Sequence, residues 1–372
     1  MDNVYYTVGE NVKMRFNKDT VELYSNNGTL WPDWLERAGV YRYEIKSIHV
    51  AEGTVYLPEW SGGIYKEEAL YAGFGGLSNM KSIDLSRFDT SRVKDMSWMF
   101  YDCQNLEHLD LSSFDTQNVT NMKFMFYNCN ALRDINTHGL NTANVTNMHG
   151  MFTACQSLEK VNLKDLNTSK VKDMYGMFFD CCSLANLDLS GFDTSEAMEM
   201  GFMFGNCNQI TYLNINGFDT KNVTNMKNMF AGCCELTEMD LSRLNMSNVR
   251  SLYSMFDGCT NIQHVNLQGL DLKKVLEMKR MFEGCENLTE VDFRGVRTQE
   301  VIDMSSMFSG CTKLQRLDIS DLNISGVMNM SQMFSQCIEL QEIAMSALTG
   351  KDVNTDDMFD GCRENIDIEA KN

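Results

Sequence analysis

The feature that most constrains the fold of this sequence is a repeat of 26 residues. The dipeptide Met-Phe recurs at steps of 26 residues, with one last step of 25, and a cysteine follows each of these methionines by four residues. Chance does not keep so many positions in phase, and a fixed period of this length is typical of chains whose units stack on one another. The chain is therefore predicted to form a solenoid. The repeated methionines are Met99, Met125, Met151, Met177, Met203, Met229, Met255, Met281, Met307, Met333 and Met358.

The first half of a unit predicts a strand. In the unit of residues 103–128, Leu106, Leu109 and Leu111 alternate at their end with a polar residue. Such alternation is typical of a short strand with one buried face. Stacked units would join these strands into a parallel sheet with neighbours about 4.8 Å apart. One coil cannot bury its own apolar side chains, so we expect the stability to come from the interfaces between coils.

The second half of a unit predicts a short helix. Asp115 and Thr116 are suitable N-caps, and Val119, Met122 and Met125 follow at helical spacing, with an adjoining phenylalanine on the same face. The residue before the cysteine is Gly or Asn in seven coils, which suits a left-handed residue at a helix end. Those residues are Asn128, Asn206, Gly232, Gly258, Gly284, Gly310 and Gly361.

These patterns predict an α/β fold class. We expect a right-handed solenoid of about 11–12 coils of 26 residues, with a parallel sheet of short strands on one face and short helices on the other. Residues 1–66 are predicted to form an N-terminal capping region, residues 67–362 the repeat solenoid, and residues 363–372 a C-terminal tail.

Charge and hydropathy disfavour several classes of partner. The net charge of −19 disfavours nucleic acid and anionic membrane surfaces, because both carry negative charge. No apolar run approaches 18 residues, so no membrane insertion is expected. Residues 1–5 lack the basic and apolar regions of a signal peptide, and no anchoring signal is seen, which leaves the compartment open. We expect a monomer.

The repeat resembles that of the BspA-like leucine-rich repeat family, a 26-residue repeat of bacterial surface proteins. The family pattern is Met-Phe-x-x-Cys-x-x-Leu-x-x-Leu-Asp-Leu-Ser-x-Phe-Asp-Thr-Ser-x-Val-x-x-Met, and it stands almost complete at Met99–Met122 and Met177–Met200. The resemblance covers roughly residues 70–362. It implies a leucine-rich-repeat-type solenoid, a location at the cell surface or outside the cell, and a role in binding or adhesion.

The cysteine column has three interpretations. Zinc ligands must converge on one point, whereas a linear column spreads its thiols along an axis. Disulfides between parallel side chains one coil apart lack the required dihedral angle. We favour a column of small buried side chains at a tight turn. Cys182 and Cys234, which directly follow column cysteines, are expected to be more exposed and more reactive than the others.

Other polar columns give no catalytic or metal site. An Asp or Asn column runs through the strands from Asp110 to Asp318, and we favour side chains that hydrogen-bond along the sheet over a calcium site, which needs six to eight oxygens around one point. The five histidines are expected to be solvated, and His108 and His264 lie too many coils apart to share a ligand. No catalytic triad, phosphate loop or zinc-protease motif is present. We therefore predict no catalytic residues, no metal and no cofactor.

Binding is expected on the sheet face, where residues vary while the frame stays fixed. Two variable columns flank the buried strand position, and in them Tyr212 is the one aromatic residue and the best anchor candidate. A solvated face without a ligand is the alternative for these columns. The candidate residues are His108, Asp134, Lys160, Tyr212, Glu238, His264, Glu290 and Arg316.

These inferences lead to one functional prediction and one alternative. We predict a non-enzymatic binding or adhesion solenoid with an extended surface for a protein or glycan partner. The alternative is a structural spacer or stalk of a surface protein with no ligand of its own.

Overall fold

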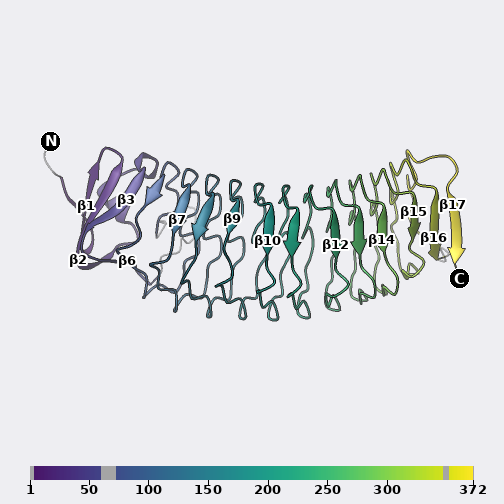
Figure 1. The fold of residues 1–372 in the computed structure, drawn as a ribbon, viewed down its shortest axis with the longest axis horizontal. Helices are drawn as coiled ribbons and strands as arrows, with labels where there is room; N and C mark the ends of the chain where they lie inside the picture. Colours follow the sequence, from purple (N-terminus) through teal and green to yellow (C-terminus); the bar gives the residue numbers. More distant parts are fainter. Residues whose placement is uncertain (1–3, 60–72, 347–351, 372) are drawn as a thin grey trace. The chain divides into compact units, whose positions relative to one another are not determined.

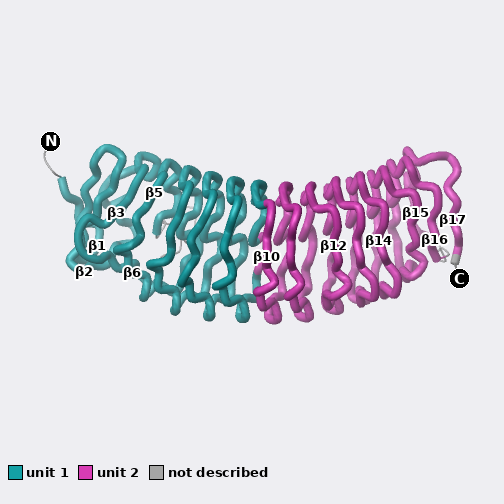
Figure 2. Tube along the Cα trace, viewed as in Figure 1, with its two compact units in different colours: residues 1–173, 177–184 teal, residues 174–176, 185–372 magenta. Residues whose placement is uncertain are grey.

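The computed structural model describes residues 4–59, 73–346 and 352–371 of the 372-residue chain (Figure 1). They divide into two compact units (Figure 2). Unit 1 comprises Met1–Asp173 and Met177–Leu184, and unit 2 comprises Met174–Gly176 and Ala185–Asn372. Over the described residues, strands and turns form nearly all of both units, and none of the helices is long and apolar enough to cross a membrane.

Unit 1 begins with a capping sheet. The strands β1 (Tyr6–Asn17) and β2 (Thr20–Leu30) form an antiparallel hairpin, and the short helix α1 (Trp34–Ala38) and the 3-10 turn η1 (Arg42–Glu44) follow. The strand β2 pairs in parallel with β3 (Ser47–Glu52) and β4 (Val55–Tyr56), which in turn pair with β5 (Ser82–Ile83) and β6 (Phe88–Asp89). This sheet thus pairs in parallel with the strands of the first repeat. The predicted boundary after residue 66 lies outside the described residues.

Each later repeat contributes one short strand. Unit 1 holds β7 (His108–Asp110), β8 (Asp134–Asn136) and β9 (Lys160–Val161). Unit 2 holds β10 (Asn186–Asp188), β11 (Tyr212–Asn214), β12 (Glu238–Asp240), β13 (His264–Asn266), β14 (Glu290–Asp292), β15 (Arg316–Asp318), β16 (Glu342–Ser346) and β17 (Asp367–Lys371).

The spacing of these strands confirms the predicted coil. Together with β5 they make twelve strands that begin 26 residues apart, except for the last step of 25. Paired strands are parallel and shifted by one repeat, as in His108 opposite Asp134. The strand β17, in the segment predicted as a tail, pairs with β16 and so extends the ladder of unit 2.

The core of each unit is a column of stacked phenylalanine rings. In unit 2, Phe230 is fully buried and lies between Phe204 and Phe256, with ring centroids 5.7 and 5.2 Å apart. In unit 1, Phe126 lies in the same way between Phe100 and Phe152. Burial of such a ring is worth roughly 1.5–3 kcal/mol, and here the coils on either side supply it.

The predicted helix face is wrong. Residues such as Val119–Phe126 form consecutive tight turns, so the repeats are β-solenoid coils and not α/β units. Their backbone N–H groups alternate: that of Met125 donates within the coil to Met122 (3.2 Å), and that of Phe126 donates to Met151 of the next coil (2.9 Å). A helix would satisfy both internally. The alternation instead ties each coil to its neighbour at every second residue.

Two left-handed residues per coil make these turns possible. The first precedes the Met-Phe pair, as at Phe124 (φ 53°), and the second precedes the cysteine, as at Asn128 (φ 62°) and Gly232 (φ 72°). The left-handed residue before the cysteine confirms that prediction, although it ends a turn rather than a helix. The first left-handed position carries residues as large as Phe and Arg280 (φ 58°), so its residue type gave no indication of its backbone.

Buried polar groups bond from coil to coil. The Cys259 thiol donates to the carbonyl oxygen of Phe230 (3.1 Å), and the other column cysteines with a described contact repeat this bond. Ten of the column cysteines are buried, which confirms the interpretation as core side chains, and Cys362 is half-buried. Cys182 and Cys234 are half-buried as well and thus more exposed than most of the column, as predicted.

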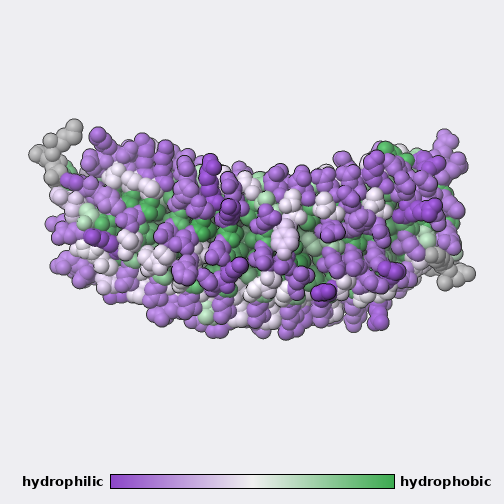
Figure 3. Space-filling view, in the orientation of Figure 1, coloured by the Kyte–Doolittle hydropathy of each residue, from purple (hydrophilic) through white to green (hydrophobic). Residues whose placement is uncertain are grey.

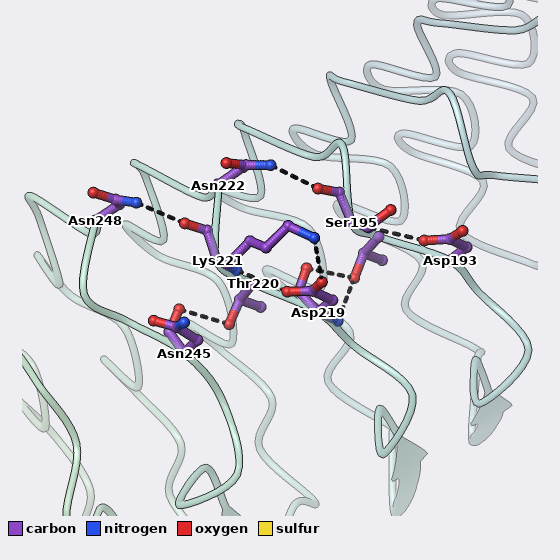
Figure 4. A network of polar contacts seen from close by, with 9 residues as sticks. Asp193, Ser195, Asp219, Thr220, Lys221, Asn222, Asn245 and Asn248 are labelled. Carbon is purple, nitrogen blue, oxygen red and sulfur yellow. Dashed lines mark hydrogen bonds and ion pairs between the residues drawn. The ribbon is translucent and has the colours of Figure 1, made fainter.

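In the turn that follows each strand, which we call the corner, polar groups also bond from one coil to the next (Figure 4). Thr194 donates through its hydroxyl to the carbonyl of Asp219 (3.0 Å) and accepts from the N–H of the same residue (2.8 Å). Asp219 accepts the N–H of Lys221 (3.1 Å), an Asx turn in place of the predicted helix cap. The Asn222 amide donates to the carbonyl of Ser195 (2.8 Å) and closes the network.

Candidate functional site

The structure places every candidate residue at the first position of a strand, with its side chain exposed. In unit 1 these residues follow one another in register along the ladder of β7, β8 and β9, and in unit 2 along β11 to β15. The prediction that these positions form exposed columns is confirmed within each unit. The unit 1 residues are His108, Asp134 and Lys160, and the unit 2 residues are Tyr212, Glu238, His264, Glu290 and Arg316.

In unit 1 the strands β7, β8 and β9 form one ladder, and over the described residues no pairing joins this ladder to β5. The strand β8 pairs with both β7 and β9. His108 Nδ1 lies 2.7 Å from Asp134 Oδ2, and Arg133 lies 3.8 Å from Glu159. Each pair joins an acidic side chain to a histidine or an arginine on the neighbouring strand.

In unit 2 the strand ladder is interrupted twice. The strands form the groups β10–β11, β12–β13–β14 and β15–β16–β17, and over the described residues no pairing joins β11 to β12 or β14 to β15. A shallow hollow lies at each interruption. On the face shown in Figure 3, hydrophilic side chains (purple) surround patches of apolar surface (green). At the first interruption Leu213 is half-buried, while the apolar strand residues Met239, Val291 and Leu317 beside the two interruptions remain buried.

The hollow at the first interruption has an apolar floor and a polar rim. It has a volume of about 390 Å³. Leu213 and Met239 lie in the floor, and Tyr212, whose side chain is 53% exposed, stands beside them. Glu238 and His264 line the rim. Three of the candidate residues therefore surround one concave apolar surface, the arrangement in which aromatic anchors of interfaces are usually found.

The hollow at the second interruption is acidic. It has a volume of about 500 Å³ and is lined by six carboxylates and two guanidinium groups. Arg316 lies 3.3 Å from Glu342, and Arg294 donates to Asp292, which holds the pKa of that carboxyl below its usual value. Both guanidinium groups thus have carboxylate partners, and the hollow keeps an excess of negative charge. The carboxylates are those of Glu290, Asp292, Asp318, Asp321, Glu342 and Glu369.

Sequence reasoning missed most of this second hollow, although the Asp and Asn column held a sign of it. Where an Asn follows an Asp, its amide donates to the preceding carboxylate, as Asn214 does to Asp188 (3.0 Å), and the strands pair. Two aspartates follow each other in this column at Asp292 and Asp318, and Asp84, which directly follows β5, precedes Asp110 in the same way. Like charges on adjacent strands repel, and there the ladder breaks.

The turn side of unit 2, which we call its frame, is continuous over the coils that carry both hollows. On the turn side of unit 2, backbone bridges join Glu199, Asn225, Ser251, Glu277 and Asp303 in succession, and continue to the residues that follow. These bridges pass the levels of both interruptions. The coils therefore remain stacked where the strands separate.

The polar side chains of the strand face bond to one another from coil to coil. Among the described residues, no group of three or more His, Cys, Asp or Glu side chains is arranged to hold a metal ion. The calcium interpretation of the Asp and Asn column thus gains no support. The favoured alternative is confirmed at two steps, where Asn136 donates to Asp110 (2.9 Å) and Asn214 to Asp188.

A family model described as "Mycoplasma protein of unknown function, DUF285" matches the chain repeatedly. The matched segments are residues 68–160, 109–212, 134–233, 158–265, 201–293 and 250–370, and together they cover most of the chain. This match agrees with the BspA-like leucine-rich repeat predicted from the residues. No curated protein matches the sequence.

Solved leucine-rich repeat proteins of bacteria are among the similar structures. A leucine-rich repeat protein from Eubacterium ventriosum has 12% identity and a TM-score of 0.34, with 96% of this chain and 95% of that chain covered. A leucine rich cell surface protein from Faecalibacterium prausnitzii has 14% identity and a TM-score of 0.30, with 78% and 95% covered. The leucine rich repeat protein of T. pallidum has 14% identity and a TM-score of 0.29, with 84% and 90% covered. Likeness at these TM-scores defines no shared ligand.

Proposed function

The chain belongs to the family described as Mycoplasma protein of unknown function DUF285, and we propose that it is a non-enzymatic binding protein that holds a protein partner on the strand face of unit 2. One observation carries the proposal. The strand ladder opens into two hollows, while the turn-side bridges behind them continue without a break. We further propose that this binding takes place at a cell surface, as the BspA-like repeat implies.

A spacer would need only the frame. Its strand face would gain nothing from an exposed tyrosine beside an apolar floor, because exposed apolar surface favours association. Tyr212 next to Leu213 and Met239 is such a surface, and the strand residues around it differ from coil to coil. The observed face therefore favours the binding protein over the spacer.

The experiment compares two triple variants of the full chain. The strand-face variant carries Tyr212→Ala, Glu238→Ala and Arg316→Ala. Its matched control carries Met198→Ala, Glu300→Ala and Arg250→Ala, exposed residues of the same unit that lie outside the strands. Each variant loses one large apolar side chain, one acid and one base, so the net charge is unchanged in both. Urea melts check that both variants remain folded.

The chain and both variants are used to capture partners from solubilised cell-surface proteins, and each captured protein is purified and titrated against all three. We expect the strand-face variant to bind at least about tenfold more weakly, because buried anchors dominate interface energies, while the control stays within about twofold. Equal affinity of both variants for every purified partner would move the site off this face. If the chain captures no partner at all, the spacer alternative is favoured.

A further inference from the structure

We propose that the segment that docks on unit 2 is an extended, basic stretch of a partner protein, which places an apolar side chain in the β11–β12 hollow and a lysine or arginine side chain in the β14–β15 hollow. This inference rests on the proposed function and specifies its partner. Two independent observations support it, the charge of the face and the distance between the hollows.

The exposed strand positions of unit 2 are strongly acidic. The first and third residues of the strands β10 to β16 include seven carboxylates, and Arg316 is the single lysine or arginine among them. That arginine lies beside Glu342 and so neutralises little of the rest. A complementary partner is therefore basic, because like charges across an interface are costly. The carboxylates are those of Asp188, Glu238, Asp240, Glu290, Asp292, Asp318 and Glu342.

The two hollows differ in what they accept. The β11–β12 hollow is lined by the half-buried Leu213 and by the buried Leu236 and Met239, against which an apolar side chain would pack. The β14–β15 hollow presents carboxylates in excess of guanidinium groups, which a cationic side chain would offset. Lysine and arginine also carry long apolar stems, so the charged end reaches the carboxylates while the stem lies against the coil surface.

The spacing of the hollows favours an extended segment. They lie three coil steps apart within unit 2, which is about 14 Å at the usual strand spacing. An extended chain covers that distance in about four residues. Side chains four residues apart on an extended chain point to the same side, so both would face the sheet. A helix would need about nine residues for the same distance, which places the two side chains on different faces.

Synthetic peptides test this chemistry without the natural partner. The probe is a fluorescein-labelled, thirteen-residue peptide of serine and threonine that carries one leucine and one arginine four residues apart. Two comparison peptides hold the same residues three apart, or glutamate in place of the arginine. Fluorescence anisotropy on the full chain, in low salt and up to millimolar protein, gives the affinities.

We expect the probe to bind at least about fivefold more tightly than either comparison peptide, and to lose affinity as salt is raised. Glu290→Gln with Glu342→Gln should weaken the probe about tenfold, while Glu196→Gln with Glu300→Gln, which removes the same charge outside the strands of unit 2, should change it by less than about twofold. Equal binding of the three peptides, or no binding at all, would overturn the proposal. Equal loss in both double variants would reduce it to unspecific charge attraction, which also overturns it.

The outcome is distinct from that of the proposed function. If a purified protein partner loses affinity for the strand-face variant while the three peptides bind alike, the proposed function stands and the extended basic segment is wrong. If the probe binds as expected but every protein partner ignores the strand-face substitutions, the face recognises such segments and the proposed protein partner site lies elsewhere.

Discussion

The strand side and the turn side of unit 2 differ in how continuously they bond one coil to the next. On the turn side, backbone bridges and the N–H groups of the Phe column reach the next coil without a gap from Glu199 to Asn354. On the strand side, the ladder stops after β11 and after β14. Because the turn-side bonds continue where the strands separate, the coils stay stacked at both interruptions. The turn side is thus the frame of unit 2, and the strand side is the surface that this frame displays.

The strands β7, β8 and β9 of unit 1 show that the repeat itself does not impose the interruptions, because they pair with the same coil length. Over the described residues of unit 1, no pairing joins β5 to β7, so the ladder is interrupted once there as well. At the second interruption of unit 2, Asp292 and Asp318 place like charges on adjacent strands, which disfavours their pairing.

The largest expected effect lies in the frame. Phe230→Ala removes a fully buried ring from the middle of the unit 2 column and leaves a cavity between its two neighbours. We expect the free energy of unfolding to fall by about 3–5 kcal/mol in urea melts. A loss below about 1 kcal/mol would show that the Phe column is not what holds the coils together.

The labelling rates of the cysteine thiols report how well the coils shield them from solvent. Burial raises the pKa of Cys155 to about 12, and burial together with the Asp180 carboxylate raises that of Cys182 to about 11. The thiolate is the reactive form, so at pH 8 Cys182 should react on the order of a hundredfold more slowly than a small free thiol, and Cys155 more slowly still. The expected order keeps the prediction that Cys182 is more reactive than the column cysteines, although its carboxylate neighbour lowers its reactivity below that of a free thiol. Mass spectrometry of native labelling measures this, and near-equal labelling of all thirteen cysteines would contradict a closed frame.

Loss of a hydrogen-bonding hydroxyl in the corner should lower the free energy of unfolding less than loss of a ring from the Phe column. Thr194→Val removes the hydroxyl that bonds both the N–H and the carbonyl of Asp219, and the shape of the side chain is kept. Both backbone groups lose their partner, so we expect a loss of about 1–3 kcal/mol in urea melts. Met246→Leu, at a coil where the same column is apolar, is the control and should change stability by less than about 1 kcal/mol. Equal losses would mean that packing, and not the hydrogen bonds, stabilises this corner.

The smallest effect is expected on the displayed surface. Tyr212 is 53% exposed and belongs to the interrupted side. Tyr212→Ala should change the free energy of unfolding by less than about 0.5 kcal/mol, while it weakens partner binding. A loss of stability as large as that of Thr194→Val would make Tyr212 part of the frame and would remove the distinction between the two sides.

The sequence predicted the coil period and the buried columns well, but it did not predict the backbone of the turn side, and it predicted the strand face only in outline. The 26-residue spacing, the buried cysteines and the exposure of the strand columns followed from period and polarity. The helix prediction failed because the spacing of Val119, Met122 and Met125 is also produced by successive tight turns with left-handed residues, and Phe124 at such a position gives no sign of its backbone. The hollows were missed because they depend on whether neighbouring strands pair, which a single coil does not reveal.

Amide hydrogen exchange of the native chain tests the central claim most directly. On the strand side, the N–H groups of Leu189 and Leu241 donate to the next coil (2.9 Å each), whereas the equivalent groups of Ile215 and Phe293 meet the two interruptions. We predict faster exchange at Ile215 and Phe293 than at Leu189 and Leu241, and uniformly slow exchange along the turn-side Phe column from residue 204 to residue 334. Equal protection of all four strand amides, or fast exchange on the turn side at the same levels, would contradict an open display face on a closed frame.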